Sequence, residues 1–340
     1  MPSIPRVNIG WIYPFFEILE EVGVPYDEVI EQAELPSLSL DDPSTLVPTA
    51  KIYRFVELAA REAALPDLGL RAGARIDLDS LLPDAERSWT RPGVYRSITN
   101  FIDVALESSS NVDMWIETNP GSNPMTEFFY LGTFGPDHPA FAAVEQFMVA
   151  LMVRWTRYGA NPQWNPARVN VRAGSIPLTT LRALVGDADI RCAQGVTSIV
   201  FPAQPFLGPM EEVPSKDSAI WQRHRKALSG STGKGDLAAS LRVILPAYLP
   251  DGSPGIQLAA RLAGTSVRTL QRLLEHQGVT YSQLLEELRH DLAVYLLRNP
   301  DREISEISRE LGYRDPAIFT RAFRRWTDQT PSQFRRSFDA

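Results

Sequence analysis

A run of eight residues without an apolar side chain, residues 229–236, interrupts the chain about two thirds of the way along its 340 residues. Three of the eight are glycines, and a stretch of this composition cannot pack into a core and is typical of a flexible linker. The run therefore predicts two domains, residues 1–228 and residues 237–337, joined by the linker 229–236.

The two sides of this run differ in charge. The whole chain has 34 Lys+Arg against 41 Asp+Glu, a net charge of -7, which taken alone argues against a nucleic-acid partner. Residues 255–340, however, contain 13 Arg, no Lys and 11 Asp+Glu, whereas residues 1–254 contain 21 basic and 30 acidic residues. The acidity therefore belongs to the first part of the chain, and the argument against nucleic acid does not apply to the last part.

A single cysteine, Cys192, leaves no partner for an internal disulfide and favours a reducing compartment, so we expect a cytoplasmic protein. The four histidines lack metal-ligand spacing, and the chain has neither a phosphate-binding glycine loop nor a Gly-x-Ser-x-Gly elbow. No apolar run approaches the ~20 residues of a membrane span, and the first ten residues do not resemble a signal peptide. We expect no catalytic residues, no metal, no cofactor and no membrane partner, and hence no enzyme.

Residues 1–228 combine helical and strand patterns, which predicts a mixed α/β domain whose topology stays open. Apolar residues at helical spacing predict helices over residues 14–32 with a break at 23–25, over 49–64 with Thr49 as the N-cap, and over 91–110, 141–158 and 178–185. Period-two alternation predicts a hairpin of residues 114–118 and 126–131, and shorter strands at 168–172, 189–193 and 197–201. The helix over 141–158 is apolar on several sides, which favours a central core helix over a dimer interface.

Aromatic residues are numerous enough in this domain to line an apolar ligand cavity. For each one separately, packing in the core is the better interpretation, so the residues of a ligand site stay unknown. The set consists of Trp11, Tyr13, Phe15, Phe16, Trp89, Tyr95, Trp115, Phe128, Tyr130, Phe141 and Phe147.

Two short helical segments, residues 257–263 and 267–274, are joined by Gly264, Thr265 and Ser266. Gly264 can adopt the left-handed conformation that ends the first helix, and the Ser266 side chain can cap the second. This punctuation is typical of a helix-turn-helix, although any solvated helix hairpin can share it. The outer face of the second segment carries groups that can hydrogen-bond to base edges in a major groove. These groups are Arg268, Thr269, Gln271 and Arg272.

The same arrangement recurs downstream, and the repetition strengthens the interpretation. Residues 304–311 form the first helix and residues 316–326 the second, with Asp315 as the cap of the latter. Its inward stripe is formed by Phe319, Phe323 and Trp326, and its outward side by Arg321, Arg324 and Arg325.

A single helix over residues 282–297 is predicted between the two units. Its sixteen residues provide ~24 Å of rigid spacer. Together with the widths of the flanking helices, this places the two second helices about 34 Å apart, so that they can read successive major grooves. The expected buried side consists of Leu284, Leu285, Leu288, Leu292, Tyr295 and Leu296.

From about residue 237 to residue 336, the chain resembles the DNA-binding domain of AraC/XylS-type transcriptional regulators, in which a long helix bridges two helix-turn-helix units. The first half and the spacer helix match through Leu258, Ala259, Ser266, Leu270, Gln271, Arg272, Arg289, Ala293, Leu296 and Leu297. The second half matches through Ile304, Ile307, Leu311, Gly312, Tyr313, Phe319, Arg321, Ala322, Phe323, Arg324, Pro331, Phe334 and Arg335.

The rest of the chain resembles, less specifically, the ligand-binding domain of the ornithine-regulator-like branch of that family. The matching residues are 19–24, 33–36, 47–48, 68–71, 199–202 and 206–207. The resemblance implies a domain that senses a small molecule, and it does not imply a cupin-like barrel.

The resemblance also implies roles for single residues. It extends base reading to Pro316, Ala317, Thr320 and Arg321 in the second unit, beside Arg268, Thr269, Gln271 and Arg272 in the first. Phosphate contacts are assigned to Thr265, Ser266, Arg314, Arg324 and Arg325. Because Pro316 and Ala317 cannot donate side-chain hydrogen bonds, the second unit is expected to rely on Arg321, methyl contacts and phosphates. Asp328 stands where the family usually has glycine, and we expect it to adopt the left-handed conformation without a change of fold.

We therefore expect an α+β protein with an N-terminal mixed α/β sensor domain and a C-terminal all-α domain of two helix-turn-helix units joined by a long helix. The predicted function is that of a sequence-specific transcriptional regulator, an activator, controlled by a small-molecule effector. Its recognition helices, residues 266–276 and 316–326, read double-stranded promoter DNA, and the resemblance implies contact with RNA polymerase. The sequence does not decide whether the protein forms a homodimer. The alternative of a constitutive DNA-binding regulator whose N-terminal domain only dimerises also stays open.

Overall fold

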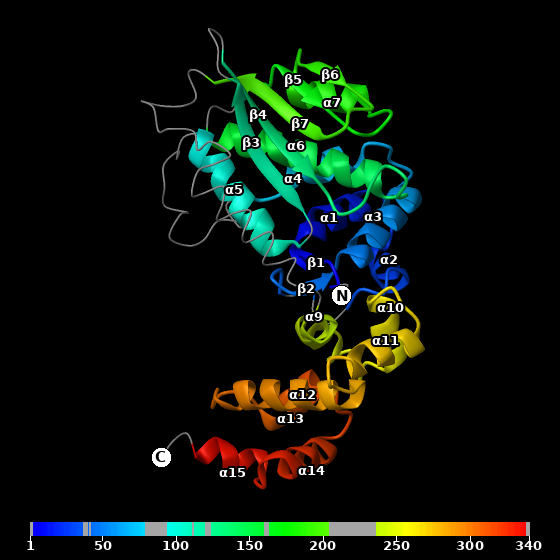
Figure 1. Ribbon diagram of the computed structural model, residues 1–340, viewed down its shortest axis with the longest axis vertical. Coiled ribbons are helices and arrows are strands. Elements are labelled where there is room, and N and C mark those ends of the chain that lie inside the picture. The colour runs from blue at the N-terminus through cyan, green and yellow to red at the C-terminus, as the bar shows by residue number, and fades with distance from the viewer. Residues whose placement is uncertain are drawn as a thin grey trace. The chain divides into compact units, whose positions relative to one another are not determined.

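The computed structural model describes residues 3–36, 40, 42–78, 94–110, 112–119, 124–159, 163–203 and 236–337. The chain forms two compact units, drawn in Figure 1. The N-terminal unit comprises Pro5–Leu35 and Thr49–Thr232, and the C-terminal unit comprises Met1–Ile4, Pro36–Pro48 and Gly233–Ala340. The first is a mixed α/β structure and the second is helical apart from one short strand, which confirms the predicted fold class.

The helices of the N-terminal unit follow the predicted pattern with one addition. They are the short helix η1 (Ile9–Ile12), α1 (Tyr13–Glu21), α2 (Tyr26–Gln32), α3 (Thr49–Ala63), α4 (Leu68–Arg75), α5 (Val94–Ser108), α6 (Phe141–Gly159) and α7 (Leu178–Val185). Gly23 has a φ of 73° between α1 and α2, so the predicted break is confirmed. The prediction that Thr49 caps α3 is wrong, because its buried hydroxyl has no hydrogen-bond partner among the described residues.

The sheet of this unit has five strands in the order β3-β4-β7-β5-β6. Their bounds are β3 (Asp113–Asn119), β4 (Met125–Leu131), β5 (Arg168–Asn170), β6 (Asp189–Arg191) and β7 (Thr197–Pro202). The predicted hairpin is confirmed as β3 and β4, with Trp115 opposite Phe129. Neighbouring strands are antiparallel except β5 and β6, and α7 provides the crossover that this parallel pair requires. Strand β1 (Arg6–Asn8) lies at the start of the unit.

Helix α6 is the central core helix of the unit, as predicted, and packs against α3, α4, α5, α7 and β7. Its contact with α4 is very close, because Gly69 and Gly73 lie one turn apart on α4 and face the α6 backbone. Helix α4 was not predicted, since two glycines in eight residues disfavour a helix in isolation. Here the tight packing that glycine permits outweighs that propensity.

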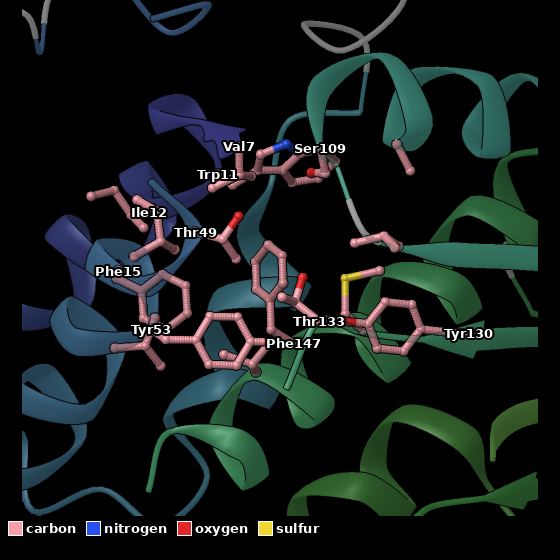
Figure 2. A pocket seen from close by; sticks show the side chains of 16 residues that line it. Val7, Trp11, Ile12, Phe15, Thr49, Tyr53, Ser109, Tyr130, Thr133 and Phe147 are labelled. Carbon is pink, nitrogen blue, oxygen red and sulfur yellow. The ribbon is translucent and has the colours of Figure 1, made fainter. Parts of the chain in front are cut away.

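The polar residues that interrupt the apolar pattern of α6 tie it to its neighbours. Glu145 is only 2% exposed and accepts hydrogen bonds from the backbone N–H groups of Arg172 (2.7 Å) and Ala173 (2.9 Å) and from the Thr197 hydroxyl. The Gln146 side chain donates to the Pro66 carbonyl at 3.0 Å, just before α4. The unit also contains a cavity, lined by residues of β1, η1, α1, α3, α5, β4 and α6 (Figure 2).

The C-terminal unit consists of short helices around one long helix. They are α9 (Leu237–Ile244), the short helix η4 (Leu245–Tyr248), α10 (Ile256–Leu262), α11 (Val267–Glu275), α12 (Tyr281–Leu297), α13 (Ile304–Glu310), α14 (Pro316–Thr327) and α15 (Pro331–Arg336). Strand β2 (Leu46–Pro48) packs against α9. The predicted linker, residues 229–236, lies outside the described residues apart from Asp236, whose carboxylate caps α9.

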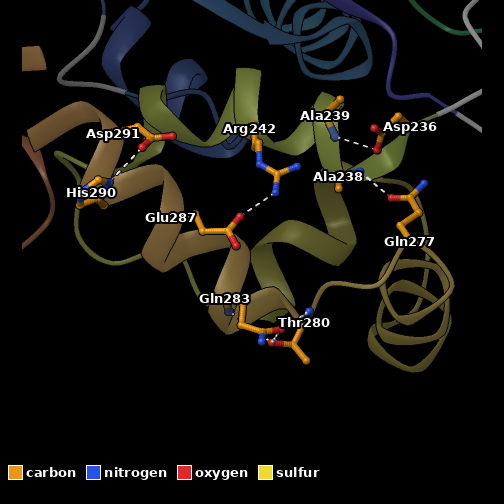
Figure 3. A network of polar contacts seen from close by, with 10 residues as sticks. All are labelled: Asp236, Ala238, Ala239, Arg242, Gln277, Thr280, Gln283, Glu287, His290 and Asp291. Atoms are coloured by element: carbon orange, nitrogen blue, oxygen red, sulfur yellow. Dashed lines mark hydrogen bonds and ion pairs between the residues drawn. The ribbon is translucent and has the colours of Figure 1, made fainter. Parts of the chain in front are cut away.

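Helix α9 is fastened to the turn and helix that follow α11, as Figure 3 shows. The Ala238 backbone N–H donates to the Gln277 side chain at 3.0 Å. Arg242 forms an ion pair with Glu287 of α12 at 2.8 Å. Thr280 and Gln283 form a capping box that starts α12. These contacts join the beginning of the unit to its long helix.

Two hydrophobic cores divide the unit, and α12 contributes to both. Its N-terminal half packs Leu284 and Leu288 against α9, α10 and α11, and its C-terminal half packs Ala293 and Leu297 against α13 and α14. The predicted buried position of Tyr295 is wrong, since this side chain is 70% exposed. The buried stripe of α12 turns between its two halves because each half faces a different core.

Within the described ranges, no helix combines the length and apolar character that a membrane span requires.

We expect Gly69→Ala to lower the free energy of unfolding by about 3 kcal/mol, because overpacking of a tight interface displaces backbone or side chains. A methyl group at Gly69 would lie 1.9 Å from the Ala143 carbonyl oxygen. Urea denaturation followed by tryptophan fluorescence measures the change. Gly174→Ala is the matched control, since a methyl group there meets no described atom within 4 Å. Equal stability of the two variants would contradict the packing argument.

Candidate nucleic-acid interface

The first helix-turn-helix is formed by α10 and α11. Gly264 has a φ of 61° after α10, and the Ser266 hydroxyl accepts a hydrogen bond from the Thr269 backbone N–H at 3.2 Å. The expected turn and cap are therefore both present. Leu270 and Leu274 are buried in the core beneath α11.

The outer face of α11 carries the predicted base-reading side chains. Arg268, Gln271 and Arg272 are exposed. Thr269 is half-buried, and its hydroxyl lies 3.0 Å from the Ser266 hydroxyl, so it belongs to the cap of the helix. Thr265, a predicted phosphate contact, is also half-buried, whereas Ser266 is exposed.

The second helix-turn-helix is formed by α13 and α14. The Asp315 carboxylate accepts a hydrogen bond from the Ala317 backbone N–H at 2.8 Å, and Pro316 occupies the first turn, so the predicted cap is present. Asp328 ends α14 in the left-handed conformation with a φ of 59°, as expected. Phe319 and Phe323 are fully buried beneath the helix.

The predicted contact residues of the second unit lie mainly at the surface. Thr320 is half-buried, and its hydroxyl donates to the Pro316 carbonyl at 2.9 Å, which leaves only acceptor capacity for another partner. The exposed members are Pro316, Ala317, Arg314, Arg321, Arg324 and Arg325.

The two helix-turn-helix units are joined by contacts from the middle of α12. The Arg289 side chain donates to the Leu311 carbonyl at 3.0 Å, and its guanidinium lies 4.8 Å from the centre of the Tyr313 ring. Gly312 has a φ of 77°, and a side chain there would lie 2.7 Å from the Leu249 carbonyl. Arg289 and Gly312 thus hold the turn of the second unit against α12 and the end of η4.

A groove of about 610 Å³ lies along α12 between α11 and α14. Gln271 and Glu275 of α11 line one side of it, and Arg325 and Trp326 of α14 line the other. Of the predicted contact residues, Gln271 and Arg325 lie in this groove. The exposed ones among the others, such as Arg268, Arg272 and Arg321, lie outside this groove.

Arg325 is paired within the protein. Its guanidinium forms an ion pair with Glu286 of α12, and the Trp326 indole N–H donates to the same carboxylate at 2.6 Å. The hydrogen bonds from Trp326 and Arg325 hold the pKa of Glu286 below its ordinary value. Sequence reasoning missed Glu286, because its partners are 39 and 40 residues away and no local spacing signals them.

Two family models match this chain. Residues 259–337 match a helix-turn-helix domain, and residues 23–210 match the N-terminal arabinose-binding domain of AraC transcription regulators. The fold and the paired helix-turn-helix units define a two-domain transcription regulator. The chain belongs to the family of AraC transcription regulators, which confirms the resemblance seen in its sequence.

Several characterised proteins are similar to parts of this chain. The ornithine utilization regulator of Pseudomonas aeruginosa is 41% identical over 86 residues, 25% of each chain, and the regulator VqsM of the same species is 39% identical over 90 residues, 26% of this chain and 28% of VqsM. The transcriptional activator RhaR of Escherichia coli is 30% identical over 184 residues, 52% of this chain and 62% of RhaR. The chain thus spans from a quarter to under two thirds of the length of these relatives.

A crystal structure of the transcriptional regulator CdpR from Pseudomonas aeruginosa aligns with 95% of this chain and 96% of its own, with a TM-score of 0.40 and 20% identity.

We expect Asp315→Ala to destabilise the start of α14, because the Ala317 N–H loses its acceptor. The cost of losing such a cap is about 1 kcal/mol. Amide hydrogen exchange measures it locally, as faster exchange at Ala317. Asp301→Ala, which removes an exposed aspartate before α13 that is not its N-cap, serves as the control. Unchanged protection of Ala317 in the Asp315 variant would contradict the assigned cap.

Proposed function

We propose that the protein is a sequence-specific DNA-binding transcriptional regulator controlled by a small-molecule effector. The observation that carries the proposal is the pair of capped recognition helices, residues 266–276 and 316–326, each of which shares a hydrophobic core with α12 within one unit. A shared rigid helix sets the spacing of the two, as reading of successive major grooves requires.

The two helix-turn-helix units are proposed to read bases with different kinds of side chain. In the first, Arg268, Gln271 and Arg272 present donors and acceptors that match guanine and adenine edges. In the second, Arg321 is the charged reader, and the apolar atoms of Pro316 and Ala317 suit contact with thymine methyl groups. The Thr269 hydroxyl belongs to the cap of α11, and the Thr320 hydroxyl donates to the Pro316 carbonyl, so both contribute less to base reading than the arginines.

Phosphate contacts are assigned to the turns and to the basic end of α14. Backbone and hydroxyl groups at Thr265 and Ser266 lie at the start of α11, where anions are favoured by the helix dipole. Arg314 and Arg324 supply exposed positive charge. Arg325 must leave Glu286 before it can neutralise a phosphate.

Ligand control is favoured over a constitutive regulator by the cavity in the N-terminal unit. The name of RhaR, a transcriptional activator, supports an activating role. We accordingly extend the proposal to activation at promoters in the cytoplasm, through RNA polymerase and with dimerisation by the N-terminal unit. The named relatives are all regulators, and no enzyme activity is proposed.

We expect Arg272→Ala to weaken binding to the selected operator by ~1 to 3 kcal/mol and to relax one base position. The operator is selected from a random DNA library with the full chain, and anisotropy titrations against single-base variants measure the change. Arg298→Ala removes an equal charge from the end of α12 and is the control. Retained selectivity at every base position in the Arg272 variant would count against base reading by this residue.

We expect Glu286→Gln to strengthen DNA binding and to increase the salt slope, d log K/d log[salt], by about one in magnitude. The substitution releases Arg325 for a phosphate and removes a negative charge from the groove. Glu287→Gln is the matched control, because this neighbour pairs with Arg242 of α9. Equal salt slopes for the two variants would show that Arg325 does not reach a phosphate.

A further inference from the structure

The cavity of the N-terminal unit has features of a binding site. Its volume is about 80 Å³, several times the ~10–15 Å³ that one buried water needs. Apolar and aromatic side chains form most of the lining, including Trp11, Phe15, Ile52, Val56 and Phe147, and none of the lining residues that the structure describes is charged (Figure 2). All of the lining belongs to this one unit.

Thr49 places an unsatisfied polar group in this apolar lining. The residue is 5% exposed, and within the described part of the chain its hydroxyl has no hydrogen-bond partner. Its backbone N–H donates to the Pro5 carbonyl at 2.8 Å, which fixes the start of α3. A buried hydroxyl without a partner is unfavourable and rare in folded proteins. The Thr49 hydroxyl therefore points to a bound molecule that supplies the missing hydrogen bond.

Three other polar side chains in or near the lining are already hydrogen-bonded within the protein. Tyr53 and Tyr130, both in the lining, are hydrogen-bonded to each other through their side chains. Burial raises the pKa of Tyr53 to about 12 and raises that of Tyr130 well above its ordinary value, so both phenols stay neutral. The buried carboxylate of Glu145 is held by the Arg172 and Ala173 backbone N–H groups. A charged ligand would find no counter-charge among the described residues of the lining.

The aromatic side of the cavity suits a flat apolar molecule. Phe147 meets Trp11 edge to face, with ring centres 6.2 Å apart, and lies 5.5 Å from the ring of Phe15. Such an arrangement presents both ring edges and ring faces, which favour stacking and edge contacts with an inserted ring.

Thr49 also lies where the chain passes from one unit to the other. The segment before it, Pro36–Pro48, belongs to the C-terminal unit, and so does Met1–Ile4, which precedes the cavity residue Val7. In the C-terminal unit, β2 packs against α9, and the Ile4 backbone N–H donates to the Ser240 hydroxyl of α9 at 3.3 Å. Thr49 is therefore the residue that follows, along the chain, a segment packed against the first helix of the C-terminal unit.

We propose that this cavity is the effector site and that it takes a small, uncharged, largely apolar molecule, aromatic or alicyclic, with one hydroxyl or carbonyl group bonded to Thr49. The inference rests on the ligand control in the proposed function and names the site and the chemical class of that ligand. Of the aromatic residues noted in the sequence, Trp11, Phe15, Tyr130 and Phe147 line it.

The test uses the full chain without DNA and six probes: phenol, benzyl alcohol, cyclohexanol, toluene, benzoate and benzylammonium. Quenching of tryptophan fluorescence and the shift of the thermal midpoint report binding, because Trp11 lies in the lining. We expect saturable binding of the neutral probes and at least tenfold weaker binding of the two charged ones.

Thr49→Val keeps the shape of the side chain and removes its hydroxyl. We expect it to raise the Kd of phenol about three- to tenfold, as loss of one hydrogen bond does, and to leave the Kd of toluene unchanged. Val56→Phe fills the cavity and should abolish binding of both. Leu178→Ala, at an exposed position on α7 outside the lining, should bind both like the parent chain.

Absence of saturable binding by every neutral probe would overturn the proposal, as would equal phenol affinity in the parent chain and Thr49→Val. If a tightly held water satisfied the Thr49 hydroxyl, the phenol Kd of the parent chain and of Thr49→Val would also be equal, and the proposal would be overturned. Operator binding is titrated separately without probes. If the parent chain did not bind a selected operator, the proposed function would be contradicted and the probe result would still stand. If the probes did not bind but the operator did, only the assigned effector site would be contradicted.

Discussion

The arrangement of the C-terminal unit depends on one helix that belongs to two hydrophobic cores. The first half of α12 closes the core of α9, α10 and α11, and its second half closes the core of α13 and α14. A helix is stiff along its axis, so both helix-turn-helix units take their positions from the same rod. Arg289, in the middle of α12, donates a hydrogen bond to the Leu311 carbonyl and so fixes the orientation of the second helix-turn-helix unit about α12. The spacing of the recognition helices is thus set by helix length.

Features with local causes could be predicted from the sequence. Gly264, Ser266, Asp315 and Asp328 act through their own backbone conformation or through an N–H two or three residues away, and the structure has each in the expected role. The strand pair β3 and β4 was predictable for the same reason. Tyr295 was misplaced because periodicity assumes one buried face, whereas α12 turns its buried stripe between two cores.

Features that join distant segments could not be predicted. In the sequence, the two glycines that allow the close contact of α4 with α6 indicate a break in a helix. Glu145, whose carboxylate is buried and hydrogen-bonded, interrupts an apolar segment in the sequence. The ion pair of Glu286 with Arg325 bridges 39 residues. The cavity gathers side chains from five helices and two strands. In each case the sequence shows the chemical character of the residue but does not show which distant residue it contacts.

Part of the positive charge of the C-terminal unit is paired within the protein, and this favours selectivity in the proposed function. Arg325, Arg302 and Arg242 are paired with glutamates, and Arg289 holds a backbone carbonyl. In the proposed function, arginines that are paired within the protein neutralise fewer phosphates, so non-specific attraction to DNA is weaker and its salt dependence shallower. A regulator competes with a large excess of non-specific sites, so weak general attraction raises the share of protein on its operator. Discrimination then rests on the fixed spacing of two helices, which α12 supplies.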